Sequence, residues 1–179
     1  MRVGINRALE NQALYENTNT NSKCIFISHK SEDIEGAEAI GDVIKQYGID
    51  IYLDINDIGL QYATENDDSE QIVQHIEKAL SVSTHILVYI TENTKDSWWV
   101  PYEIGYSKKG NIKIASLLNK HIENFPDYLK IEKTLKSVKD FNEYLNDIQD
   151  ESSSELRLSF MPENTNVYDR KLSKYIRRE

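Results

Sequence analysis

One short stretch decides the fold, Cys24-Ile25-Phe26-Ile27-Ser28 followed by His29-Lys30-Ser31. An uninterrupted run of apolar, β-branched and aromatic residues predicts a strand that is buried on both faces, as in a parallel sheet. The polar residues after it predict a turn at the end of that strand. Cys24 is the single cysteine of the chain, so it can form no intramolecular disulfide, and we expect it to be a small buried strand residue.

Alternating strands and helices follow along the chain. Apolar runs predict further strands at 49–54, 84–91, 112–118 and 131–138. Apolar residues at three- and four-residue spacing predict helices over 32–47, 72–80 and 141–148, and Pro101 places the start of another between Ser97 and Val100. Gly48 stops the first of these helices. The alternation predicts an α/β fold, a three-layer sandwich around a parallel sheet.

Three segments lie outside this pattern. Residues 55–68 are polar, contain Gly59 and show no regular spacing, which predicts a long loop of the kind that is often functional. Residues 1–22 form an Asn-rich N-terminal extension with a weak apolar spacing at Ile5, Leu9 and Ala13, which predicts a short helix and a linker. Residues 23–149 are the predicted domain. Residues 150–179 are a C-terminal extension in which we expect a helix docked by Leu172 and Ile176, with its basic face in solvent.

Composition excludes several classes of protein. The 179 residues carry 21 Lys+Arg against 30 Asp+Glu, a net charge of −9, which argues against nucleic acid as a partner. The mean hydropathy is −0.60, and no apolar run approaches the ~18 residues needed to span a bilayer. The first residues contain no signal-peptide core. We therefore expect a cytoplasmic protein without a membrane partner, although local groups could still hold a small phosphorylated ligand.

Several common site motifs are missing. The sequence has no G-x-G-x-x-G after a strand and no G-x-x-x-x-G-K-[ST], which disfavours a Rossmann dehydrogenase and a P-loop NTPase. The four histidines fall on separate elements without metal-ligand spacing, so we expect no metal site.

Ligands of an open parallel sheet bind beyond the carboxyl ends of its strands. This rule directs attention to His29, to Asp54, to Thr91–Ser97 and to the helix that carries Glu103. His29 fits equally well as a polar turn residue and as a ligand contact. Glu103 follows Trp99 by one helical turn, an arrangement that suits a ribose beside a stacked heterocycle. Burial would raise the pKa of Glu103 and the helix N-terminus would lower it, and the sequence leaves that balance open.

Four ordered motifs resemble a TIR domain over residues 23–149. They are Phe26-Ile27-Ser28-His29-Lys30-Ser31-Glu32-Asp33, Ile49-Asp50-Ile51-Tyr52-Leu53-Asp54, Ala79-Leu80-Ser81 before an apolar strand, and Ser97-Trp98-Trp99-Val100-Pro101-Tyr102-Glu103-Ile104. The resemblance implies a flavodoxin-like sheet of five parallel strands. The segment 55–68 departs from the family, because its usual Pro-Gly is absent and it is several residues longer.

The W-V-x-x-E arrangement resembles the enzymatic TIR branch that cleaves NAD+ between nicotinamide and ribose. The resemblance implies that Glu103 is the catalytic glutamate and that Trp99 is the aromatic residue one turn before it. It further implies that NAD+ is a substrate, with no cofactor. The residues it implies as substrate contacts are Phe26, Ser28, His29, Lys30, Asp54, Ser97, Trp99 and Tyr102.

The leading hypothesis is an enzyme similar to the TIR component of Thoeris antiphage defence. Such an enzyme would convert NAD+ into a cyclic ADP-ribose isomer that reaches a separate effector, and it would assemble as a homo-oligomer through TIR contacts. One alternative is a TIR interaction module without catalysis. Another is an enzyme resembling nucleoside deoxyribosyltransferases, which use a related sheet and a catalytic glutamate. A receiver domain is disfavoured because the third predicted strand ends in Ile90-Thr91 and not in Asp.

Overall fold

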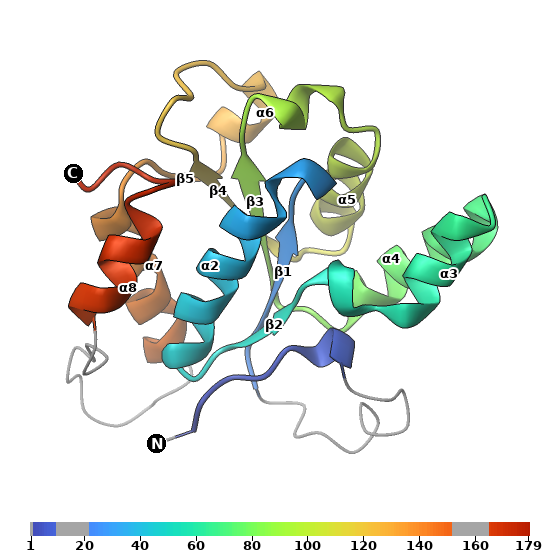
Figure 1. Cartoon of the computed structure of the whole chain (residues 1–179), viewed down its shortest axis with the longest axis horizontal. Coiled ribbons are helices and arrows are strands. Elements are labelled where there is room, and N and C mark those ends of the chain that lie inside the picture. Colours follow the sequence, from blue (N-terminus) through green and yellow to red (C-terminus); the bar gives the residue numbers. More distant parts are fainter. Residues whose placement is uncertain (1, 10–21, 152–164) are drawn as a thin grey trace.

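The computed structural model describes residues 2–9, 22–151 and 165–179, and it has a parallel sheet at its centre (Figure 1). The sheet has five strands in the order β2-β1-β3-β4-β5, and each neighbouring pair is parallel. This is the α/β sandwich with a five-stranded parallel sheet that the sequence predicts. The strands are β1 (Cys24–Ser28), β2 (Asp50–Tyr52), β3 (His85–Ile90), β4 (Lys113–Leu118) and β5 (Lys133–Leu135).

Helices cover both faces of the sheet. One face packs against α2 (Ile34–Gln46), α7 (Val138–Asp150) and α8 (Thr165–Leu172), and the other packs against α4 (Ser69–Ser81), α5 (Trp99–Lys109) and α6 (Asp127–Lys130). The side chains of β1 divide between the two cores, with Ile25 and Ile27 in the first and Cys24 and Phe26 in the second. Such alternation explains why the whole strand is apolar.

Most predicted elements are confirmed with shifted ends. β1 spans the predicted residues, and Gly48 follows α2 with a φ of 72°, a conformation that glycine adopts without strain. The fifth strand is shorter than the predicted 131–138, since only Lys133–Leu135 pairs with β4. Cys24 is fully buried in β1, and burial raises the pKa of its thiol to about 12.

The prediction of an irregular loop at 55–68 is wrong. The segment contains a 3-10 turn, η3 (Asp54–Asn56), and a helix, α3 (Ile58–Glu65). Asp57 caps α3, because its side chain accepts a hydrogen bond from the backbone N–H of Leu60 at 3.0 Å. Ala63 is the residue of α3 that is buried, so the helix shows almost no apolar periodicity in the sequence. In Figure 1, α3 and α4 project together from one side of the molecule.

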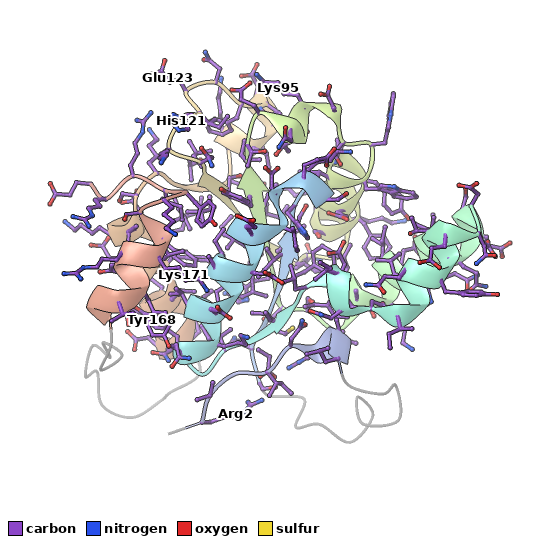
Figure 2. The ribbon with its side chains drawn as sticks, viewed as in Figure 1. Arg2, Lys95, His121, Glu123, Tyr168 and Lys171 are labelled. Atoms are coloured by element: carbon purple, nitrogen blue, oxygen red, sulfur yellow. The ribbon has the colours of Figure 1, made fainter. Side chains whose placement is uncertain are left out.

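The segments at both ends of the chain pack against the domain. A short helix was predicted in the N-terminal extension; its described residues include a 3-10 turn, η1 (Arg7–Leu9), and Ala13 lies outside the described residues. At the other end, Leu172 and Ile176 are buried in the core that α2 forms with the sheet. Lys171 of α8 pairs with Asp42 of α2 at 2.6 Å, and Tyr168 of the same helix packs against this core; Figure 2 labels both residues.

Among the residues that the structure describes, no helix combines the length and the apolar character required to cross a bilayer.

Candidate functional site

A cavity of about 570 Å³ opens at the carboxyl ends of β1 and β3. From β1 the chain proceeds to β2 on one side, whereas β3 and the later strands lie on the other side. This reversal is the position at which open α/β sheets bind their ligands. The walls of the cavity come from the turn after β1, η3, α3, α4, the segment before α5, and α5 itself.

Glu103 lines the cavity and is itself buried, with 5% of its surface exposed. The hydroxyl of Ser28, the last residue of β1, donates a hydrogen bond to Glu103 Oε2 at 2.6 Å. No salt bridge to Glu103 forms within the described ranges, although Lys30 lines the same cavity. Strand β1 and helix α5 therefore hold one carboxylate at the cavity wall without a cation against it.

The electrostatic balance that the sequence leaves open is decided by burial. Loss of water raises the pKa of Glu103 to about 8, the hydrogen bond from Ser28 opposes that rise, and the charge of Asp54 adds to it. Glu103 lies in the second turn of α5, beyond the first turn in which the helix dipole acts most strongly. Burial therefore favours the protonated form of Glu103.

Two tryptophans border the cavity beside Glu103. Trp99 is 39% exposed, and its ring meets Tyr102 edge-on with centroids 6.1 Å apart. Trp98 is 91% exposed and lines the outer part of the cavity. A flat ligand can therefore stack on Trp99 without any prior rearrangement of buried groups.

His29 and Asp54 form a second polar group in the cavity. His29 Nδ1 lies 3.8 Å from Asp54 Oδ1 and 3.2 Å from the carbonyl oxygen of Ile27. Burial raises the pKa of Asp54, and the neighbouring His29 opposes the rise. His29 thus lies in the cavity as a possible ligand contact, one of the two roles that the sequence leaves open.

Helix α3 supplies a wall that the sequence analysis does not predict. Leu60, Gln61 and Thr64 of α3 line the cavity opposite α5, and Ile72 and Ile76 of α4 complete this side. A sequence signal was available, because Asp57 and Asp68 both act as helix N-caps in the segment that was predicted to be a loop.

A half-buried cluster fixes the start of α3. The Asp57 carboxylate accepts a hydrogen bond from the hydroxyl of Tyr52, and its Oδ2 lies 3.1 Å from His75 Nδ1. Burial would raise the pKa of Asp57, but the hydrogen bonds from Tyr52 and Leu60 and the neighbouring His75 lower it below its ordinary value. The same carboxylate therefore caps α3 and joins it to β2 and α4.

A further carboxylate braces the two loops above the sheet. Asp33 accepts hydrogen bonds from the Thr91 hydroxyl at 2.6 Å and from Asn93 Nδ2 at 2.8 Å. Asp33 follows β1, and both partners follow β3, so the brace connects two walls of the cavity. Ser97 caps the start of α5 by accepting a hydrogen bond from the backbone N–H of Val100 at 3.2 Å.

The structure brings together six of the predicted site residues and separates three from the cavity. The cavity is lined by His29, Lys30, Asp54, Ser97, Trp99 and Glu103. Ser28 lies behind Glu103, and Phe26 is buried with its ring stacked on Tyr52. Tyr102 lies outside the lining and donates to Glu77 Oε1 at 2.5 Å. Because a helix turns about 100° per residue, Tyr102 and Glu103, three and four residues after Trp99, lie to opposite sides of Trp99 around the helix axis.

The described residues contain no group of three or more His, Cys, Asp or Glu side chains arranged to hold a metal ion.

Comparison with known proteins places these features in a family. The family model described as Thoeris protein ThsB, TIR-like domain, matches residues 26–124, which is more than half of the 179 residues. The match begins in β1, ends after β4, and includes Glu103 and every residue that lines the cavity. A search of the curated proteins finds no match.

Proposed function

Because the chain belongs to the family of the TIR-like domain of Thoeris protein ThsB, we propose that it serves Thoeris defence by cleaving NAD+ between nicotinamide and ribose. The observation that carries this proposal is the buried carboxylate of Glu103, which lines the cavity beside Trp99 and pairs with no cation of the described residues. A group of this kind is suited to a substrate that brings its own positive charge, as the pyridinium of NAD+ does.

Glu103 stabilises the charge that develops on ribose. When the bond between C1′ and the nicotinamide nitrogen breaks, its electron pair leaves with nicotinamide, and the ribose becomes an oxocarbenium-like cation. A carboxylate beneath the sugar binds its hydroxyls and favours this cation in a site of low water content. The bound pyridinium lowers the pKa of Glu103 from its raised value, so substrate binding itself generates the anion.

The second half of the reaction is attack on C1′. If water attacks, it loses a proton and the product is ADP-ribose. If a hydroxyl or an adenine nitrogen of the same molecule attacks, the product is a cyclic ADP-ribose isomer. Trp99 and the α3 wall restrict water, which favours the second course. The product is then a diffusible signal for a separate effector.

The remaining polar residues of the cavity bind the substrate. Lys30 is 3.9 Å from Glu32 and lines the cavity, where its ammonium group can turn toward a pyrophosphate. His29 and Asp54 offer hydrogen bonds to the second ribose or to the base. Ser28 orients Glu103 through its hydroxyl at 2.6 Å.

Nicotinamide release from NAD+ tests the proposal. We expect Glu103→Gln to lower the rate at least about 100-fold, because the amide keeps the shape of the side chain and removes the negative charge. The matched control is Glu77→Gln, which lies outside the cavity and contacts Tyr102. Retention of full activity in Glu103→Gln, or no release by the wild type even at high protein concentration, would refute the proposal. Mass spectrometry of the product separates ADP-ribose from its cyclic isomers.

A second role, assembly with other copies, is favoured by the exposed apolar residues around the cavity. Ile58 is 81% exposed and Tyr62 is 68% exposed on α3, the helix from which Leu60 and Thr64 line the cavity, and Trp98 of the lining is 91% exposed. Exposed apolar residues that gather at one place are typical of interaction surfaces. A protein that self-associates at such a surface and releases no nicotinamide would be an interaction module and not an enzyme.

A further inference from the structure

We propose that the N-terminal arm, residues 2–9, is a positioning element of the candidate site, which holds the segment carrying Asp54 in place through the side chain of Asn6. The inference deepens the proposed function, because it adds to the site a part of the chain that precedes the residues matched by the family model. Figure 1 shows the arm running along the outer strand β2.

The arm extends the sheet beyond its edge strand. The N–H of Ile51 in β2 donates to the carbonyl of Ile5 at 2.8 Å, and Asn6 pairs with Ile51 in a parallel bridge. Gly4 donates to the carbonyl of Lys45 at 2.8 Å. A Cβ at Gly4 would lie 1.9 Å from the carbonyl oxygen of Ile49, the residue before β2, so the backbone approaches Ile49 more closely than any other residue would allow.

A buried carboxylate anchors the arm at the start of β2. Asp50 is 1% exposed, and its oxygens accept hydrogen bonds from Arg7 Nη2 at 2.9 Å and from Arg2 Nη2 at 2.7 Å. The backbone N–H of Ile5 and the hydroxyl of Ser22 also donate to Asp50. A buried carboxylate requires such partners, so the arm is a necessary part of this structure. Figure 2 shows Arg2 near the start of the arm, at the edge of the molecule.

Asn6 then connects the arm to η3. The Asn6 side chain is buried, and its Oδ1 accepts from the backbone N–H of Leu53 at 3.2 Å. Its Nδ2 donates to Asn56 Oδ1 at 2.9 Å. Leu53 and Asn56 flank Asp54 in the sequence, so one side chain holds both sides of the turn from which Asp54 reaches the cavity.

Asp54 carries this influence to Glu103. The Asp54 carboxylate lies 3.8 Å from His29 Nδ1 in the cavity, and its charge contributes to the raised pKa of Glu103. If Asn6 positions Asp54, loss of the Asn6 side chain lets the Asp54 carboxylate move away from Glu103, and the weaker charge interaction lowers the pKa of Glu103. The ionisable groups that line the same cavity are His29, Lys30, Asp54, Glu65 and Asp96.

The test measures the pKa of Glu103 by ¹³C NMR on protein labelled at the glutamate carboxyl, with the Glu103 signal assigned by its absence from Glu103→Gln. We expect Asn6→Ala and Asp54→Asn each to lower that pKa. The double variant should titrate like Asp54→Asn alone, because Asn6 acts through Asp54. The control is Ile148→Val, a buried change in α7 on the other face of the sheet, which should leave the pKa unchanged.

Two outcomes would overturn the inference. One is an unchanged Glu103 pKa in Asn6→Ala, and the other is an equal shift with and without Asp54. If Asn6→Ala fails to fold, Asn56→Ala, which removes one hydrogen bond from the same turn, should give a smaller shift in the same direction. The titration requires no turnover, so it separates this inference from the proposed function. With NAD+ as substrate, kcat/KM should fall between about 10-fold and 100-fold in Asn6→Ala and stay unchanged in Ile148→Val.

Discussion

Two carboxylates are buried at opposite ends of the same sheet, and their surroundings differ in kind. Asp50, at the amino end of β2, accepts hydrogen bonds from two arginines, a backbone N–H and a hydroxyl. Glu103, beyond the carboxyl end of β1, accepts one from the hydroxyl of Ser28. Both are at most 5% exposed. Burial alone therefore does not distinguish a structural carboxylate from a candidate catalytic one.

The two carboxylates differ in whether a cation of the described residues pairs with them. Asp50 has two arginines of the arm against it, so its carboxylate has partners only while the arm is in place. Glu103 faces a cavity and has no cation among the described residues, so its anionic form is destabilised until a positively charged group arrives. An arrangement that is unfavourable for folding is thus favourable for binding and stabilising a cation.

Removal of the buried cation at Asp50 should produce the largest effect. Arg7 is 8% exposed, and Arg7→Met would leave Asp50 without its best-buried partner. We expect a loss of about 3–5 kcal/mol of unfolding free energy, and a Tm lower by at least about 6 °C. Thermal denaturation followed by circular dichroism measures this change.

The control for that prediction is Arg2→Gln. The Arg2 side chain is 54% exposed, although it also pairs with Asp50. An exposed partner contributes less, so the loss should stay within about 1 kcal/mol. Equal destabilisation by both variants would show that burial does not set the strength of these two ion pairs.

The pH dependence of stability should reveal the opposite behaviour at Glu103. Its pKa in the folded protein is about 8, above the ordinary value of 4.5, so the folded state holds a proton that the unfolded state has released between these two pH values. Wild-type stability therefore decreases as the pH rises through this window. Glu103→Gln cannot titrate and should escape this loss.

Melting curves of both proteins at pH 5 and pH 9 measure the effect. Relative to the wild type, Glu103→Gln should gain at least about 3 °C in Tm at pH 9 compared with pH 5. Other titrating groups are common to both proteins and cancel in this comparison. A Tm difference that does not vary with pH would show that folding does not raise the pKa of Glu103.

The smallest expected effect concerns the product and not the rate of cleavage. Trp99 lines the cavity beside Glu103, and Trp99→Ala would admit water to the site. We expect the ratio of cyclic product to ADP-ribose to fall about fivefold, equivalent to ~1 kcal/mol of barrier. Nicotinamide release should decrease less than cyclic product does. Trp98→Ala, at a residue 91% exposed, is the comparison, and equal losses of both products in Trp99→Ala would assign Trp99 to binding alone.

Much of the architecture could be predicted from local sequence. The run Cys24–Ser28 is apolar because its side chains enter two cores, one on each face of the sheet, and that requirement is visible in the residues themselves. The helical spacing of Trp99 and Glu103 likewise places both on the cavity. Tyr106, one turn after Glu103, lies outside the cavity lining.

Other features depend on contacts between distant segments. Helix α3 leaves apolar residues such as Ile58 and Tyr62 exposed, so its apolar spacing does not mark a buried face. Its start is held by Tyr52 and His75 through Asp57, and these contacts between separate elements leave no periodic pattern in the sequence. Tyr102 has the right residue type for a ligand contact, but it turns toward Glu77 on α4. Hydrogen-bond partners 18 or 25 positions apart leave no local pattern in the sequence.

The sequence by itself determined the parallel α/β fold, the edge of the sheet where the cavity opens, and the glutamate that lines it. It could do so because apolar periodicity and strand order are local consequences of burial. Only the tertiary structure decided how that glutamate is charged, what forms the opposite wall, and why residues 2–9 belong to the same domain. Those properties arise from desolvation and from hydrogen bonds between remote segments, which exist only after the chain has folded.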